Sequence, residues 1–248
     1  MESRDMIVYT LNTPDCNKVS ITLEELGLKY QVRKVNVSKG EQKEPWFTEI
    51  NPNGRIPALV DQLPDGSTIK LFESGSIMQY LTDRYDQEHR ISFPRGTPEY
   101  YETGNWLFFQ NAGVGPIQGQ AVHFLRYNPV KMEYSTSRYI NETRRLYRVL
   151  DKHLATRDYL VGGKCTIADI AHWGWVTAAF WAGVDLGQFP NLARWEKRMR
   201  ARPGVQRGKE IPDRHWIDVV TESPEMIQMV ERENAKWIQA AQVQNAQL

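Results

Sequence analysis

Residues 13–16 place a hydroxyl, a carboxylate and a thiol at the start of a predicted helix. Amide N–H groups at a helix N-terminus stabilise an anion such as a thiolate, and the Thr13 hydroxyl can donate a hydrogen bond to that sulfur. Cys16 stands where a redox Cys-x-x-Cys motif has its second cysteine, but Thr13 takes the first position and no internal disulfide can form here. The simpler alternative is that Thr13 or Asp15 only caps the helix, with Cys16 a helix residue first and a redox thiol second.

Two further segments carry chemistry of a different kind. Ile56 and Pro57 open a predicted strand, where a cis bond would leave the Ile56 backbone free to pair with an extended peptide. A trans proline at a strand start is the commoner arrangement. Glu73 and Ser74 stand at a strand-to-helix junction, where Ser74 can bind a carboxylate and Glu73 can pair with an ammonium. Together they would recognise a small zwitterion. Taken separately, the simpler alternative is that Ser74 is an N-cap and Glu73 an ordinary first-turn acid.

Composition excludes several other classes of protein. Thirty-one Lys and Arg residues against 30 Asp and Glu give a net charge of +1, so there is no protein-wide field to attract nucleic acid or an anionic membrane. Two cysteines exclude a disulfide-rich secreted scaffold and a multi-cysteine metal site. The five histidines show no metal-ligand spacing, so we expect no metal. The polar N-terminus and the interruption of the apolar stretch 170–189 by His172 and Asp185 predict a soluble, cytoplasmic protein.

The elements that position these residues differ between the two halves of the chain. In residues 6–86, strand signals at 6–11 and 30–37 enclose a helical spacing, which predicts a βαβ unit with parallel strands. Runs at 56–61 and 68–72 around a Pro-Asp-Gly turn predict an antiparallel hairpin, and a last helix follows. The order βαβ-ββα is the thioredoxin-like α/β arrangement.

After a linker at 87–97, residues 98–208 predict an all-α helical bundle. The predicted helices lie at 99–124, 133–154, 166–181 and 191–201. The first should bend around Gly113 and Gly115, and the third, apolar nearly all round, should lie at the centre. The tail 209–248 contains one more predicted helix that begins at Ser223. Its apolar face would cover a cosubstrate cleft, pack on a partner subunit, or pack on its own domain.

The three segments in this order, followed by an all-helical half, resemble a glutathione S-transferase over residues 6–208. Residues 105–110 (NWLFFQ) and 119–124 (GQAVHF) are similar to the nu-class and yeast nitrogen-regulator branch of that family, which includes fungal and bacterial members. Thr166 and Asp169 match the capping box of the family, in which Thr166 caps a helix and Asp169 returns a bond to the cap amide.

The resemblance implies a glutathione site. Glu73 and Ser74 would hold the γ-glutamyl end, and the Ile56 backbone before a cis Pro57 would pair with the cysteinyl part. Thr13 would face the sulfur, and we therefore call residues 13–16 the sulfur-facing turn.

The resemblance also implies more distant contacts and a homodimer. Gln42 and Arg55 lie where the family often contacts the glycyl end. In this branch the helix that carries Asn105 and Gln110 often reaches the site of the partner subunit, and Arg126 could assist. Separately, Phe109 and Val114 could line an apolar pocket for a cosubstrate between the domains.

One position departs from the pattern of the branch. The branch usually has Thr-Pro-Asn-Gly at the sulfur-facing turn, whereas this chain has Thr13-Pro14-Asp15-Cys16. An Asn side chain can donate to a thiolate, but an ionised Asp cannot, and its charge opposes thiolate formation. Either Asp15 points away as a cap, or the chemistry differs.

The resulting prediction is a glutathione transferase that binds glutathione and activates its thiol as a thiolate for attack on a small electrophile. The attack would give a stable conjugate, or a reversible addition to an activated alkene. The latter would make the protein a cis-trans isomerase, acting on a fungal secondary metabolite. Attack on a disulfide or peroxide is an alternative, and so is a non-enzymatic regulator that keeps the fold as a binding module.

Overall fold

The structure is a computed structural model, and it describes residues 6–245. Its N-terminal part is built on a four-stranded sheet with the strand order β2-β1-β3-β4. The strands are β1 (Ile7–Thr10), β2 (Gln31–Lys34), β3 (Ala58–Gln62) and β4 (Thr68–Phe72). β1 and β2 run parallel, and β3 is antiparallel to both β1 and β4. The predicted βαβ-ββα order is confirmed.

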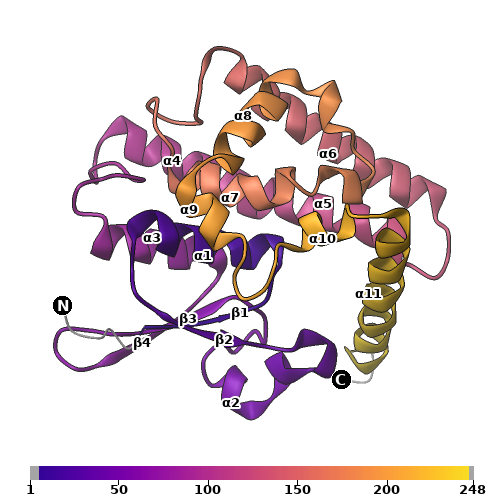
Figure 1. Cartoon of the computed structure of the whole chain (residues 1–248), viewed down its shortest axis with the longest axis horizontal. Coiled ribbons are helices and arrows are strands. Elements are labelled where there is room, and N and C mark those ends of the chain that lie inside the picture. The colour runs from indigo at the N-terminus through magenta and orange to yellow at the C-terminus, as the bar shows by residue number, and fades with distance from the viewer. Residues whose placement is uncertain (1–5, 246–248) are drawn as a thin grey trace.

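Two long helices cover one face of this sheet. α1 (Pro14–Leu26) and α3 (Ser74–Tyr85) lie between the sheet and the helical part, while the short α2 (Pro45–Thr48) lies on the opposite face (Figure 1). Two 3-10 turns, Val37–Lys39 and Glu41–Lys43, precede α2. The apolar side chains of α1 and α3 belong to the same buried cluster as those of the helical part, so the two halves share one core.

The helical part begins with a continuous helical run over residues 98–127. It consists of α4 (Pro98–Phe108), the π-helical segment η3 (Phe109–Val114), α5 (Gly115–Val122) and the π-helical segment η4 (His123–Tyr127). The predicted helix at 99–124 is therefore present, and a π-helical segment lies where the bend was expected. A π-helical segment adds a residue to the turn and so changes which side chains face inward.

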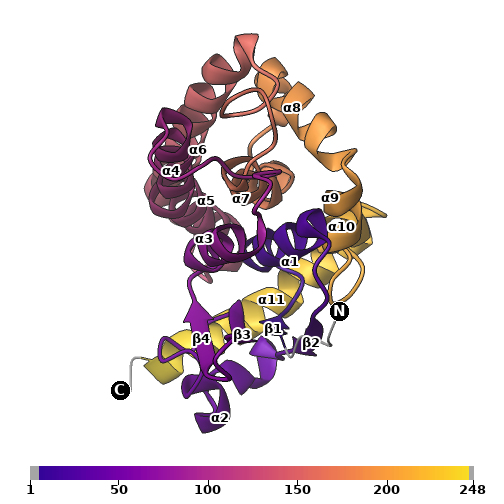
Figure 2. The ribbon, with the colours of Figure 1, turned by 90° about the vertical axis from the view of Figure 1, so that its left-hand side faces the viewer.

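The remaining helices enclose α7. They are α6 (Glu133–His153), α7 (Ile167–Val176), α8 (Pro190–Arg200) and α9 (Pro203–Gly208), with 3-10 turns at Leu154–Thr156, Ala179–Ala182 and Leu186–Gln188. Figure 2 shows α7 surrounded by α4, α5, α6, α8 and α1. Nine of its residues are buried, which confirms its central position, although it ends at Val176 and not at the expected residue 181. The capping box of Thr166 and Asp169 is present.

The tail adds two helices, α10 (Trp216–Val220) and α11 (Pro224–Asn245). α11 runs away from the helical part and beside the sheet domain (Figures 1 and 2). It packs on its own chain, because Glu231 pairs with Arg126 at 2.9 Å and Gln239 donates to the Tyr127 carbonyl at 2.8 Å. Within residues 6–245, no helix has the length and hydropathy needed to cross a bilayer.

Candidate functional site

Sheet register brings the three predicted segments to one edge. Tyr9 pairs with Ala58, and Ala58 pairs with Phe72. The sulfur-facing turn follows β1, the Ile56–Pro57 bond precedes β3, and Glu73 follows β4. These junctions therefore lie side by side at the carboxyl end of β1, where ligands gather in α/β domains.

The Thr13 hydroxyl caps α1. Its oxygen accepts the backbone N–H of Cys16 at 3.3 Å, which leaves the hydroxyl proton available for another acceptor. The Cys16 side chain is completely buried inside α1, and burial raises the pKa of its thiol above the usual value. The interpretation of Cys16 as a helix residue first agrees with this placement.

Asp15 does not cap the helix. Its carboxylate oxygen lies 2.8 Å from the Lys18 ammonium and accepts the indole N–H of Trp175 at 3.0 Å. Burial by itself would raise the pKa of Asp15, but the Lys18 charge and the hydrogen bonds from Lys18 and Trp175 outweigh it, so that pKa lies below the usual value. Asp15 is therefore ionised and already paired across the domain boundary.

Lys18 lies beside the predicted site, in contact with Asp15 and Ser74, and was not predicted from the sequence. Its ammonium contacts oxygen atoms from three elements, namely those of Asp15, Ser74, Gln110 and Asn111. The sequence did carry one signal: a lysine near a helix N-terminus is unfavourable to the helix dipole, which indicates that it has a specific partner.

Ile56 and Pro57 are joined by a cis peptide bond, as the resemblance implied. The neighbouring Arg55 is exposed, and its charge acts favourably on the Asp15 carboxylate. The Gln42 side-chain oxygen is buried, and it has no hydrogen-bond partner among residues 6–245. A buried acceptor without a donor is costly, so the Gln42 side-chain oxygen can accept a hydrogen bond from a bound molecule.

Glu73 has a backbone conformation that is rare outside glycine, with φ of 67° and ψ of 113°. Such strain persists where the surrounding structure and function require it. Its carboxylate is exposed and makes no ion pair with any residue that the structure describes. Ser74, which begins α3, is buried, and its hydroxyl accepts from Lys18 at 3.3 Å.

The other predicted residues lie elsewhere. Asn105 is exposed on α4, while Gln110 is fully buried in its own subunit and accepts from Lys18. The Arg126 guanidinium is occupied by Glu231 and by backbone carbonyls. Phe109 stacks on His172, and Val114 is fully buried.

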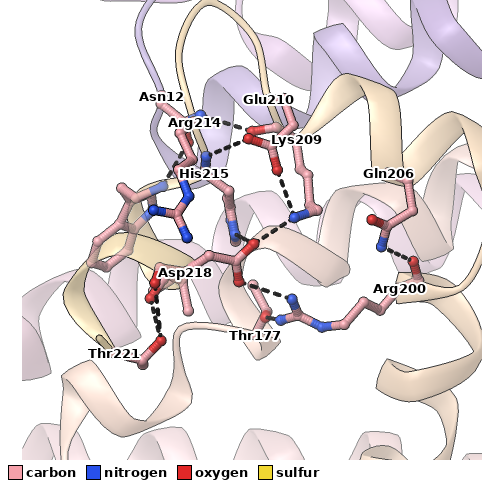
Figure 3. A network of polar contacts seen from close by, with 12 residues as sticks. Asn12, Thr177, Arg200, Gln206, Lys209, Glu210, Arg214, His215, Asp218 and Thr221 are labelled. Carbon is pink, nitrogen blue, oxygen red and sulfur yellow. Dashed lines mark hydrogen bonds and ion pairs between the residues drawn. The ribbon is translucent and has the colours of Figure 1, made fainter. Parts of the chain in front are cut away.

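A polar network ties Asn12, the residue before the sulfur-facing turn, to the tail (Figure 3). The side-chain amide of Asn12 donates to the carbonyls of Lys209 and Asp213, each at 2.7 Å. In the same network Asp218 pairs with Lys209 and, at 3.1 Å, with Arg200. The residue before Thr13 is thus held by the segment that follows the helical bundle.

A cavity of about 510 Å³ lies between the C-terminal half of α3, the linker and α4. Its walls include Asn105 and the exposed aromatic residues Tyr101 and Phe108. None of the three predicted segments contributes to it. No group of three or more histidine, cysteine or acidic side chains within residues 6–245 could hold a metal ion.

Comparison with known proteins gives consistent matches. The family model described as glutathione S-transferase, N-terminal domain, matches residues 14–84, and that described as glutathione S-transferase, C-terminal domain, matches residues 122–203. The glutathione S-transferase-like protein tpcF of Aspergillus fumigatus is 42% identical over 81% of this chain and 93% of its own length. The disulfide-bond oxidoreductase YfcG of Escherichia coli is 40% identical over 80% of this chain and 91% of its own.

Solved structures agree with these matches. A glutathione transferase homolog from Lodderomyces elongisporus, crystallised with two GSH per subunit, superposes with a TM-score of 0.80 at 43% identity. The match covers 85% of this chain and all of that one.

Proposed function

Because the chain belongs to the glutathione S-transferase family, we propose that it binds glutathione at the edge of the sheet where the sulfur-facing turn, Ile56–Pro57 and Glu73 meet. The γ-glutamyl carboxylate would lie on the Ser74 hydroxyl and the first amides of α3, and its ammonium on Glu73. The strained Glu73 is the observation that carries this assignment, since its carboxylate makes no ion pair with any residue in 6–245.

The rest of glutathione would extend along the same edge. The Ile56 backbone would pair with the cysteinyl part, and Gln42 and Arg55 would contact the glycyl end. Thr13 would donate its free hydroxyl proton to the sulfur, because the hydroxyl oxygen is already engaged with Cys16. Glutathione itself would be the nucleophile, since the Cys16 thiol is inaccessible.

We propose that this thiolate attacks an electrophilic carbon of a small molecule. The attack gives a stable conjugate or, with an activated alkene, a reversible adduct that rotates and releases both the isomerised product and glutathione. The similarity to a fungal protein named glutathione S-transferase-like supports this class of reaction, and a fungal secondary metabolite is the substrate we favour. Thiol–disulfide exchange is a second candidate, favoured by the similarity to a protein named disulfide-bond oxidoreductase.

We also propose that the protein is a cytoplasmic homodimer. The exposed Tyr101 and Phe108 beside the cavity at α4 form an apolar face that a second copy would cover. Asn105 lies on that face, whereas Gln110 and Arg126 are occupied within their own subunit and would need to exchange partners to reach a neighbouring site. Both cysteines are free and buried, as expected in a reducing compartment.

The test is calorimetry with glutathione, followed by assays on 1-chloro-2,4-dinitrobenzene, a small disulfide and an activated cis-alkene. We expect saturable binding and turnover in at least one assay. An absence of binding at millimolar glutathione would overturn the proposal. Binding without turnover in any assay would favour a regulator that uses the fold as a binding module.

A further inference from the structure

Lys18 is a buried cation at the junction of the two domains. Only 2% of its side-chain surface is exposed, and its ammonium lies 2.8 Å from Asp15, 3.3 Å from the Ser74 hydroxyl and 3.0 Å from the Asn111 amide oxygen. The amide oxygen of Gln110 is a further acceptor. An ammonium has three protons to donate, so these four oxygens saturate it.

Only one of these partners is charged. Removing an ammonium from water is costly unless an opposite charge compensates for it, and Asp15 is the acid in contact with Lys18. The three neutral oxygens come from α3 and η3 and fix the position of the cation. A Cβ atom added to Gly75 would collide with the Asn111 amide, so α3 and η3 pack closely together beside Lys18.

Asp15 lies in the first turn of α1, two residues after Thr13. A carboxylate at this place opposes the formation of any other anion nearby, including a thiolate held by the Thr13 hydroxyl. The indole N–H of Trp175 supplies a hydrogen bond to Asp15 but no charge. Lys18 is therefore the group in direct contact that cancels the charge of Asp15.

We propose that Lys18 is a positioning residue for the glutathione transferase reaction: its ammonium neutralises Asp15 and holds the Ser74 hydroxyl, and so keeps the sulfur-facing turn able to stabilise a thiolate. This inference rests on the proposed function, because the thiolate is that of bound glutathione. On binding, the thiol proton passes to solvent. The departure from the Thr-Pro-Asn-Gly pattern is in this way compensated within the fold.

Other ionisable groups surround the pair. The charge of the exposed Arg55 acts on Asp15, and Glu73 directly precedes Ser74 at the start of α3. His172 of α7 remains neutral, because burial lowers its pKa to about 4. Cys16 remains a thiol, because burial raises its pKa. None of these groups contacts the Lys18 ammonium among the residues described.

The experiment is an ultraviolet titration of the thiol of bound glutathione, with calorimetry confirming saturation of each protein. The variants are Lys18→Met, Asp15→Asn and the two combined, with Lys29→Met, an exposed lysine after α1, as a matched control. Lys18→Met is expected to raise the thiol pKa by about one unit, because an uncompensated charge several ångströms away has an effect of that size. Asp15→Asn should lower it, and the double variant should return it to near the wild-type value.

If Lys18 had only a structural role, Lys18→Met would lower the free energy of unfolding. Adding Asp15→Asn to Lys18→Met would then not restore the thiol pKa. An unchanged pKa in Lys18→Met, or an absence of rescue, would therefore overturn the inference. If Lys18→Met does not fold, Lys18→Gln takes its place, because it removes the charge of Lys18 but keeps a hydrogen-bond donor, and an unchanged thiol pKa in that variant overturns the inference. A wild-type protein that fails to bind glutathione would overturn the proposed function, and this inference with it. A wild-type protein that binds glutathione, with an unchanged thiol pKa in Lys18→Met, would overturn this inference alone.

Discussion

The backbone of Gly174 in α7 touches the backbone of Pro14 in the sulfur-facing turn. A Cβ atom at position 174 would lie 2.8 Å from the Pro14 carbonyl oxygen and 3.2 Å from its Cα. Real Cβ atoms essentially never lie within 3.0 Å of another heavy atom, so the backbone of α7 or of the turn would have to shift. The position of the turn that carries Thr13 is thus set directly by the central helix of the other domain.

Gly174→Ala should for this reason displace the sulfur-facing turn. We expect a loss of about 1–3 kcal/mol in the free energy of unfolding from overpacking, together with a fall in turnover larger than any change in glutathione affinity. Denaturant unfolding and steady-state kinetics measure both. Gly119→Ala is the matched control, because the nearest atom to its added Cβ is a Trp175 ring carbon at 3.7 Å. Its helical position favours alanine by about 1 kcal/mol, and equal behaviour of the two variants would contradict the argument.

Ser74→Ala should weaken glutathione binding. A hydrogen bond to a carboxylate contributes about 1.5–3 kcal/mol, so the dissociation constant measured by calorimetry should rise about tenfold or more. Ser76→Ala is the control, since Ser76 is an exposed residue in the same turn of α3. If the two substitutions change the affinity equally, the γ-glutamyl end does not lie on Ser74.

Local signals in the sequence were sufficient for the sheet and its edge. The Pro64-Asp65-Gly66 turn predicted the hairpin of β3 and β4, and the apolar spacing that ends at Gly27 predicted α1. The three segments that meet at the edge each carried a motif. Their convergence followed from strand order alone, because parallel and antiparallel pairing fix which ends of the strands lie together.

The environment of Lys18 could not be predicted in this way. Its partners Ser74, Gln110 and Asn111 are 56, 92 and 93 residues away along the chain, and they meet it only through packing between domains. Nothing local shows that a π-helical segment turns Gln110 inward. Asn12 likewise contacts Lys209 and Asp213, which are about 200 positions away along the chain. The hold of the tail on the residue before the sulfur-facing turn could therefore not be predicted from the sequence either.

Cys16→Ser should leave the glutathione-dependent reaction within about threefold of the wild-type rate. The Cys16 thiol is completely buried, and burial raises its pKa, so the thiol is neither accessible nor ionised. Thr13→Val is the contrasting variant. It removes the hydroxyl that would donate to the sulfur, and should lower turnover about tenfold. Loss of activity in Cys16→Ser with glutathione binding preserved would show that a protein thiol is the nucleophile.

The stability of the protein should fall as the pH drops below about 6.5, in part because of His172. Its Nδ1–H donates to the Ala168 carbonyl at 2.8 Å, while Nε2 is buried and has no partner among the described residues. Burial lowers the pKa of His172 from 6.5 to about 4. Between these values the unfolded chain binds a proton that the folded chain does not, so stability present above pH 6.5 is lost as the pH falls towards 4.

His172→Phe should remove this contribution. From pH 7 to pH 5 one such group accounts for about 2 kcal/mol, so the variant should lose that much less of its free energy of unfolding than the wild type. Urea unfolding at several pH values measures the difference. Some dependence should persist, because burial also lowers the pKa of His215 to about 4. If the wild type and His172→Phe lose the same free energy over this range, His172 is already charged in the folded protein at pH 5, and the buried imidazole has a compensating partner that the structure does not show.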